Sequence, residues 1–81
     1  MKTYYIIFRE EKVGDTPYNA HCGTFEQLQA ARDERSFIER HLTKRELDAC
    51  TITIGKVNVP DDMDAAAALE YALENGYYAI C

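Results

Sequence analysis

The sequence predicts a small α+β protein, in which two helices pack on one face of a sheet of three or four strands. Two stretches, residues 3–9 and 50–59, are rich in β-branched and aromatic residues, as strands are. Two others, residues 24–42 and 61–75, place apolar residues at helical spacing. A chain of 81 residues holds one hydrophobic core, so we expect a single domain over residues 1–81, a two-layer sandwich of order β-(β)-α-β-α-β.

The first strand has apolar side chains of both parities. Tyr4, Ile6 and Phe8 point to one face of an extended segment, and Tyr5 and Ile7 point to the other. This pattern indicates an interior strand, or a strand whose second face meets a partner.

A short second strand is expected at residues 18–22, where it pairs with the first strand as a hairpin. Gly14 and Asp15 are the turn formers between the two strands.

The first helix is predicted to begin at Thr24, because Thr24 and Gln27 have the spacing of a capping box. Further capping-box patterns predict a break near Ser36 and a short turn that begins at Thr43. The helix carries one narrow apolar stripe, interrupted by an arginine: Leu28, Ala31, Arg35, Ile38 and Leu42.

The strand at residues 50–59 alternates apolar and polar residues, but Val57 and Val59 have the opposite parity to Ile52 and Ile54. Gly55 lies where the phase changes, so we expect a bulge there that returns both valines to the same face.

The second helix is expected to follow a cap at Asp61 or Asp62 and to end at Gly76. Its predicted buried side is Ala65, Ala66, Leu69, Ala72 and Leu73, and its predicted outer side is Asp64, Ala67, Tyr71 and Glu74. Residues 77–81 form a short final strand, which a right-handed parallel crossover would join to the strand at residues 50–59.

The net charge of −5 lies entirely in residues 57–81, which contain five acidic residues and no Lys, Arg or His. The first 56 residues hold nine acidic and nine basic side chains, which cancel. An acidic protein is repelled by nucleic acid phosphates, so direct nucleic acid binding is disfavoured and a basic partner surface is favoured.

No pattern of residues predicts catalysis, a cofactor or a metal. His21 and Cys22 are adjacent in a predicted strand and therefore point to opposite faces, which prevents a direct thiol–imidazole pair. Cys50 and Cys81 add no close-spaced pair of the kind that structural zinc requires. The aspartates near residue 62 lack the glycine and glutamate spacing of a calcium loop. Enzyme activity is therefore not expected.

The sequence contains no secretion signal, no apolar run long enough to span a membrane and an odd number of cysteines, so a cytoplasmic location is expected.

The second helix presents the best candidate for a binding site. Tyr71 at the centre of an acidic outer face suits an aromatic anchor ringed by charge, which would attract Lys- and Arg-rich surfaces. The candidate partner-binding residues are Asp61, Asp62, Asp64, Glu70, Tyr71 and Glu74.

In its small size and in the charge layout of residues 57–81, the chain resembles the small acidic inhibitors encoded by phages and mobile elements, such as anti-CRISPR proteins and other DNA mimics. The resemblance matches no family motif residue by residue. It implies a mode of action, in which a non-enzymatic protein occupies the basic, nucleic-acid-binding surface of a partner complex such as a bacterial defence system.

Two alternatives remain at this point. One is a small regulatory or structural module that forms a homodimer through a sheet face bearing Tyr5 and Ile7. The other is a thiol or zinc protein built on the cysteines and histidines.

Overall fold

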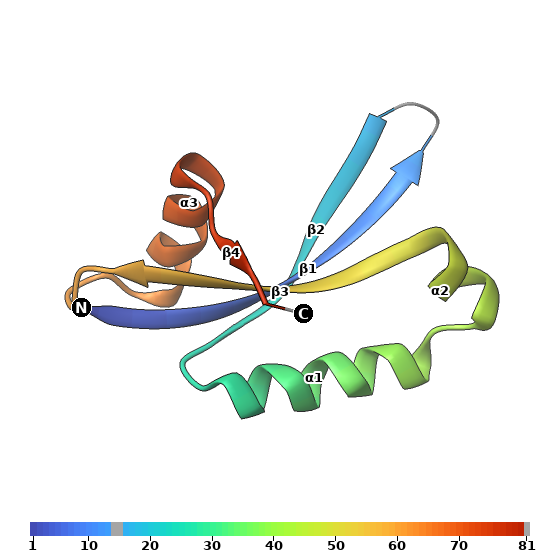
Figure 1. Ribbon diagram of the computed structural model, residues 1–81, viewed down its shortest axis with the longest axis horizontal. Helices are drawn as coiled ribbons and strands as arrows, with labels where there is room; N and C mark the ends of the chain where they lie inside the picture. The colour runs from blue at the N-terminus through green and yellow to red at the C-terminus, as the bar shows by residue number, and fades with distance from the viewer. Residues whose placement is uncertain (14–15, 81) are drawn as a thin grey trace.

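The computed structural model describes residues 1–13 and 16–80, with side chains for all of these except residues 12–13 and 16–19 (Figure 1). In chain order the elements are β1 (Lys2–Val13), β2 (Thr16–Phe25), α1 (Leu28–His41), α2 (Lys44–Ala49), β3 (Cys50–Val59), α3 (Ala65–Asn75) and β4 (Tyr78–Ala79). The four strands form one antiparallel sheet of order β2-β1-β3-β4. The predicted α+β class is confirmed.

Strand β1 lies in the interior of the sheet, as its two apolar faces predict. It pairs along its length with β2 on one side and with β3 on the other. Ile6 and Ile7 point to opposite faces, and both side chains are fully buried. Both faces of the sheet therefore carry a core.

The two longer helices cover opposite faces of the sheet (Figure 1). On one face, Ala31 of α1 packs with Ile7 and Ile54. The other core, under α3, consists of Tyr4, Ile6, Phe8, Val57, Val59, Ala68 and Ala72. The prediction that both helices share one face is wrong, because β1 has apolar side chains of both parities and each set needs its own cover.

Gly55 does not mark a bulge. The register between β1 and β3 runs without a shift from Lys2–Val59 to Glu11–Cys50. Ile54 therefore stays on the α1 face while Val57 and Val59 stay on the α3 face, and the predicted return of the valines to a common face is wrong.

The predicted hairpin of β1 and β2 is confirmed, and β2 is longer than expected. A register shift between Ile7 and Phe8 places an extra residue, Cys22, in β2, which is the local form of a β-bulge. Gly14 and Asp15, the predicted turn formers, lie outside the described residues.

The predicted capping box at Thr24 is wrong, because β2 continues to Phe25. Helix α1 begins at Leu28 after Gln27, whose side chain makes no capping hydrogen bond. Thr24 Oγ1 instead lies 2.8 Å from His21 Nε2. Strand pairing with β1 thus prevails over the local helix signal.

Helix α1 is continuous through Ser36, so the predicted break there is wrong. Its apolar stripe does pack on the sheet, with Ala31 buried and Leu28 and Ile38 half-buried. The signal at Thr43 is confirmed as the start of α2: the Glu46 backbone N–H donates to Thr43 Oγ1 at 3.2 Å, and the Thr43 N–H donates to Glu46 Oε1 at 3.3 Å.

Strand β4 runs antiparallel to β3, so the predicted parallel crossover is wrong. Helix α3 ends at Gly76, as predicted, and the φ of +89° at this residue is one that glycine tolerates. The chain therefore turns back after α3 instead of crossing over the sheet. No helix within residues 1–13 and 16–80 is long and apolar enough to cross a membrane.

Candidate interaction surface

Five carboxylates gather on α3 and on the segment that leads into it. Asp61, Asp62, Asp64, Glu70 and Glu74 are all exposed. We call these five residues the acidic surface. Because α3 covers one face of the sheet and α1 the other, the acidic surface lies on the side of the molecule away from the charged helices α1 and α2 (Figure 1).

Two of these carboxylates have partners within the chain. Asp64 is the N-cap of α3, and its Oδ1 accepts a hydrogen bond from the Ala67 backbone N–H at 2.9 Å. Asp61 lies 3.1 Å from the amino group of Met1. For Asp62, Glu70 and Glu74, no ion pair joins them to a base in the described part of the chain.

Tyr71 does not stand at the centre of the outer face. It is half-buried and packs against the core under α3, whereas Leu73, which was expected to be buried, is 62% exposed. The helix turns Ala68 and Ala72 to the sheet because these small side chains let the two backbones approach closely. The outer face of α3 therefore presents Leu73 beside Glu70, with Glu74 on the other side of Glu70.

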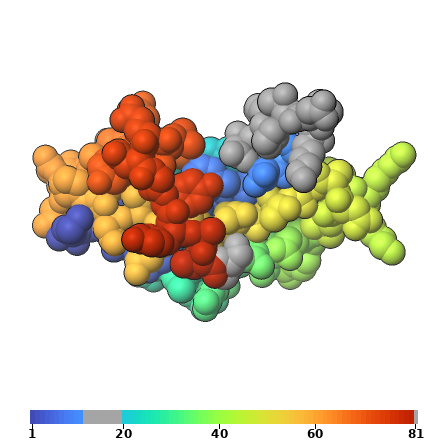
Figure 2. Space-filling model, turned by 45° about the horizontal axis from the view of Figure 1, so that its top comes forward, coloured from blue at the N-terminus to red at the C-terminus, as the bar shows by residue number. Residues whose placement is uncertain are grey.

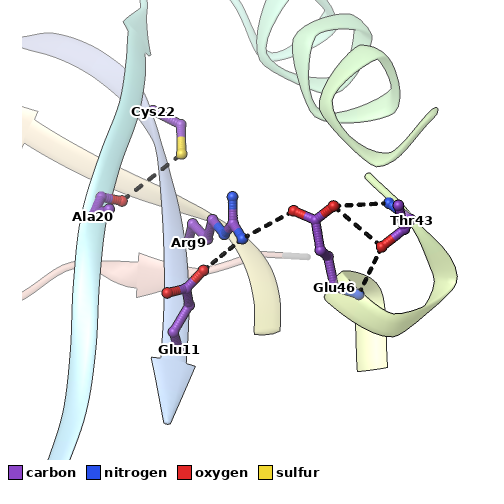
Figure 3. Close-up of polar contacts among 6 residues, drawn as sticks. All are labelled: Arg9, Glu11, Ala20, Cys22, Thr43 and Glu46. Carbon is purple, nitrogen blue, oxygen red and sulfur yellow. Dashed lines mark hydrogen bonds and ion pairs between the residues drawn. The ribbon is translucent and has the colours of Figure 1, made fainter. Parts of the chain in front are cut away.

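The α1 side differs from the acidic surface, because it carries charges of both signs and two of its bases pair with nearby acids. Arg9 contacts Glu11 at 2.5 Å and Glu46 at 3.7 Å (Figure 3), and Arg35 contacts Glu39 at 2.9 Å. Burial opposes the charge of Arg9, but Glu11, Cys50 and Glu46 together outweigh it and raise its pKa. The Arg9–Glu46 contact joins β1 to α2, whereas residues 57–81, which carry the acidic surface, contain no Lys, Arg or His.

The cysteines and histidines of residues 1–13 and 16–80 do not assemble into a site. His21 is exposed, whereas Cys22 is half-buried against the α1-side core, and its thiol points to the Ala20 carbonyl oxygen at 3.8 Å (Figure 3). Burial raises the pKa of the Cys22 thiol, which keeps it protonated near neutral pH. His41 Nδ1 lies 2.8 Å from the Phe37 carbonyl oxygen of its own helix.

No group of three potential metal ligands occurs within residues 1–13 and 16–80. Cys81 lies outside the described residues.

The sheet face proposed for a homodimer is covered. Ile7 is fully buried beneath α1, and Tyr5 packs against the same core. A dimer through Tyr5 and Ile7 would require α1 to leave the sheet, so the structure contradicts this form of the alternative.

A pocket of about 380 Å³ lies beside the acidic surface, where α3 ends and β4 begins. Three tyrosine rings line it, those of Tyr71, Tyr77 and Tyr78. The outer edge of β3 contributes Lys56, Val57 and Asn58, and the end of α3 contributes Asn75 and Gly76. In Figure 2 the C-terminal segment, coloured red, lies across the yellow strand β3 on the same side as α3.

Sequence reasoning offered Tyr77 and Tyr78, with Tyr18, as further partner contacts, but it missed this pocket and the exposure of Leu73 and Ile80 near it. The available signal was Gly55, a glycine in the middle of a strand, which indicates the close approach of another group. That group is the Tyr77 ring, which a Cβ at position 55 would meet.

No protein-family model, curated protein or solved structure matches this chain.

Proposed function

We propose that this protein is a non-enzymatic interaction module that binds a basic, nucleic-acid-binding surface of a partner protein through its acidic surface, and thereby inhibits that partner. The observation that carries the proposal is the separation of charge between the two faces of the sheet. On the α1 side Arg9 and Arg35 pair with nearby acids, whereas Asp62, Glu70 and Glu74 have no ion pair in the described part of the chain.

Surface carboxylates without an ion pair would mainly raise the rate at which the protein and its partner associate. Clustered carboxylates attract a Lys- and Arg-rich surface over a distance of about 8 Å at physiological ionic strength, and they accelerate association with it. Binding through such charges is expected to weaken steeply as salt rises. Charge alone gives little specificity, so a contact that excludes water is also needed.

Leu73 takes the place that sequence reasoning gave to Tyr71. Its exposed side chain lies on the outer face of α3, one helical turn from Glu70. An apolar residue next to a carboxylate can bury area against a partner while its neighbour meets a basic side chain. Leu73 is thus the proposed apolar contact of the acidic surface.

The proposed partner class follows from the sign of the charge. Surfaces that hold nucleic acid are much more positively charged than protein–protein interfaces. A bacterial defence complex that handles nucleic acid is the example that the resemblance to small phage inhibitors implies. The proposal concerns this class of surface and names no single partner.

The experiment compares affinity capture by three immobilised chains, namely the original chain, Glu70→Lys with Glu74→Lys, and Asp33→Lys with Asp48→Lys. The last variant makes the same change of charge at exposed positions of α1 and α2. We expect the original chain and the α1–α2 variant to capture a nucleic-acid-binding protein that added double-stranded DNA or RNA displaces, and the α3 variant to lose it.

Equal capture of that protein by the α3 variant would contradict the proposal. So would a captured partner that has no affinity for nucleic acid and is not displaced by it.

A further inference from the structure

The outer edge of β3 is only partly paired. Strand β4 pairs with Gly55 and Lys56 alone, and the Ile80 N–H donates to the Ile54 carbonyl oxygen at 2.9 Å. Backbone groups of alternate residues point to the same side of a strand, so Ile54, Lys56 and Asn58 all direct N–H and C=O groups outward. At Asn58 no strand among the described residues pairs on that side.

The pocket lies at this unpaired position. Gly76, which would face Asn58 if β4 were longer, instead donates its N–H to the Ala72 carbonyl oxygen at 2.9 Å as the end of α3. The chain thus leaves the edge of β3 open between α3 and β4, and the tyrosine-lined pocket of about 380 Å³ occupies the opening.

The lining combines aromatic rings with polar groups. Asn58 Oδ1 already accepts from Thr3 Oγ1 at 2.7 Å, and Asn75 Nδ2 donates to the Tyr71 carbonyl oxygen at 3.1 Å. These bonds hold both amide side chains in place while leaving the Asn58 NH₂ group and the Asn75 oxygen for other partners. Tyr78, which is 75% exposed, forms the open side of the pocket.

We propose that this pocket receives an aromatic side chain from an extended, basic segment of the partner, which adds backbone hydrogen bonds to the open edge of β3 at Asn58. The inference rests on the proposed function and specifies how the partner would be held. Three tyrosine rings favour an aromatic occupant, because offset or edge-to-face ring pairs add to the area buried.

The charges determine which residues flank the aromatic one. Lys56 lines the pocket, so a basic side chain is disfavoured inside it. Glu74 follows Tyr71 by three residues and therefore lies beside the pocket on the helix surface, with Glu70 one turn before it. Lys or Arg side chains on either side of the aromatic residue would meet these two carboxylates.

A second copy of this chain is a poor occupant. Pairing of two copies at this edge would bring two acidic surfaces together, and repulsion of like charges at an interface is costly. A basic segment gains from the same charges. Charge complementarity therefore selects a different protein as the occupant.

The test selects binders from a displayed library of random ten-residue peptides against the intact chain. We expect the selected peptides to carry one aromatic residue flanked by Lys or Arg. The chain has no Trp, so the emission of a Trp-containing peptide reports its own burial by a blue shift. Hydrogen exchange at the Asn58 amide should slow when the peptide is bound, because that N–H gains an acceptor.

Three changes complete the test, each measured with the selected peptide. Substitution of its aromatic residue by Ala, or Tyr78→Ala in the protein, should each weaken binding by about tenfold or more, as for a central contact. Phe37→Ala removes a 50% exposed aromatic from α1 and should change binding by less than about twofold, as expected for a residue outside the interface. A library that yields no binder, or binders that need neither the aromatic residue nor Tyr78, would overturn the inference.

The Glu70→Lys, Glu74→Lys variant separates this inference from the proposed function. If that variant loses the peptide while the aromatic residue and Tyr78 prove dispensable, the acidic surface is supported as the binding site and the pocket assignment is wrong. If the aromatic residue and Tyr78 are essential while charge reversal has no effect, the pocket is supported as the binding site and the role proposed for the acidic surface is wrong.

Discussion

Gly55 and Tyr77 show how one residue fixes the C-terminal segment on the sheet. The Tyr77 ring lies directly over the Gly55 backbone and stacks on Phe8, with 4.6 Å between ring centroids and 18° between ring planes. A side chain at position 55 would push this ring away from Phe8. The glycine is therefore needed for close approach.

Gly55→Ala should destabilise the fold by about 1–3 kcal/mol, the usual cost of overpacking a buried position. The control is the same substitution in a Tyr77→Ala background, where the obstacle is gone and the change should be close to neutral. Urea denaturation of the four proteins measures the coupling. A similar cost in both backgrounds would mean that Tyr77 is not what excludes a side chain from position 55.

Asp64 and Asp62 offer a matched pair of aspartates. Asp64→Ala removes the N-cap of α3 and should cost about 1 kcal/mol of unfolding free energy, whereas Asp62→Ala removes the same charge without a capping bond and should cost less than about 0.5 kcal/mol. Chemical denaturation measures both. Equal effects would assign the contribution to charge instead of to capping.

The Cys22 thiol should titrate above its ordinary pKa of 9.0, because burial disfavours the thiolate. The folded state then holds this proton more tightly than the unfolded chain does, so the associated stability is present below pH 9 and declines as the pH rises through the pKa of the folded state. The rate of iodoacetamide alkylation against pH, measured on a variant with Cys50→Ser and Cys81→Ser, gives the midpoint. A midpoint at or below 9.0 would contradict the burial of this thiol.

At the scale of elements, helix α3 was found in the sequence but its orientation was not. Its alanines and leucines define a broad apolar side, and helical spacing alone centres that side near Leu69. Packing instead favours the position that brings the smallest residues, Ala68 and Ala72, against the sheet and places Tyr71 at the margin of the core. Helical periodicity does not weigh side-chain size, so the roles of Tyr71 and Leu73 could not be assigned from it.

The orientation of α3 has a direct consequence for stability. Tyr71→Ala should destabilise the fold by about 2 kcal/mol, since it removes an aromatic side chain that packs on the core, whereas Leu73→Ala should change stability by less than about 0.5 kcal/mol. Thermal or urea unfolding compares the two variants. A larger loss of unfolding free energy for Leu73→Ala than for Tyr71→Ala would support the orientation predicted from the sequence.

The sequence predicted the ends of one strand, β3, but not those of β2, which is longer than expected. The strand at residues 50–59 was identified with its observed ends, because Pro60 and the preceding polar region delimit it. The signal at Thr24 failed because pairing with β1 extends β2 over it, and pairing is a long-range effect that a local motif does not contain. Thr43 and Glu46 form their capping box because no strand competes for those residues.

At the scale of the whole molecule, the sheet separates two kinds of surface. The apolar side chains on both faces of β1 indicated an interior strand or one whose second face meets a partner. They did not indicate which helix covers which face, and the number of layers depends on that. Once α1 and α3 lie on opposite faces, the acidic residues of the last third of the sequence become one side of the molecule. The structure thus shows where on the molecule the net negative charge lies. The partner-binding role of the candidate residues stays a prediction: Asp61, Asp62, Asp64, Glu70, Tyr71 and Glu74.

The most direct test of the acidic surface is the affinity of the chain for its captured partner as a function of salt concentration. At about 0.15 M salt, Glu70→Lys with Glu74→Lys should weaken binding by roughly 100-fold, equivalent to about 2.7 kcal/mol for two reversed charges, whereas Asp33→Lys with Asp48→Lys should leave it within about threefold. The affinity of the unmodified chain should fall steeply as salt rises. Equal affinities for the two charge-reversed variants, or binding that does not respond to salt, would contradict the account.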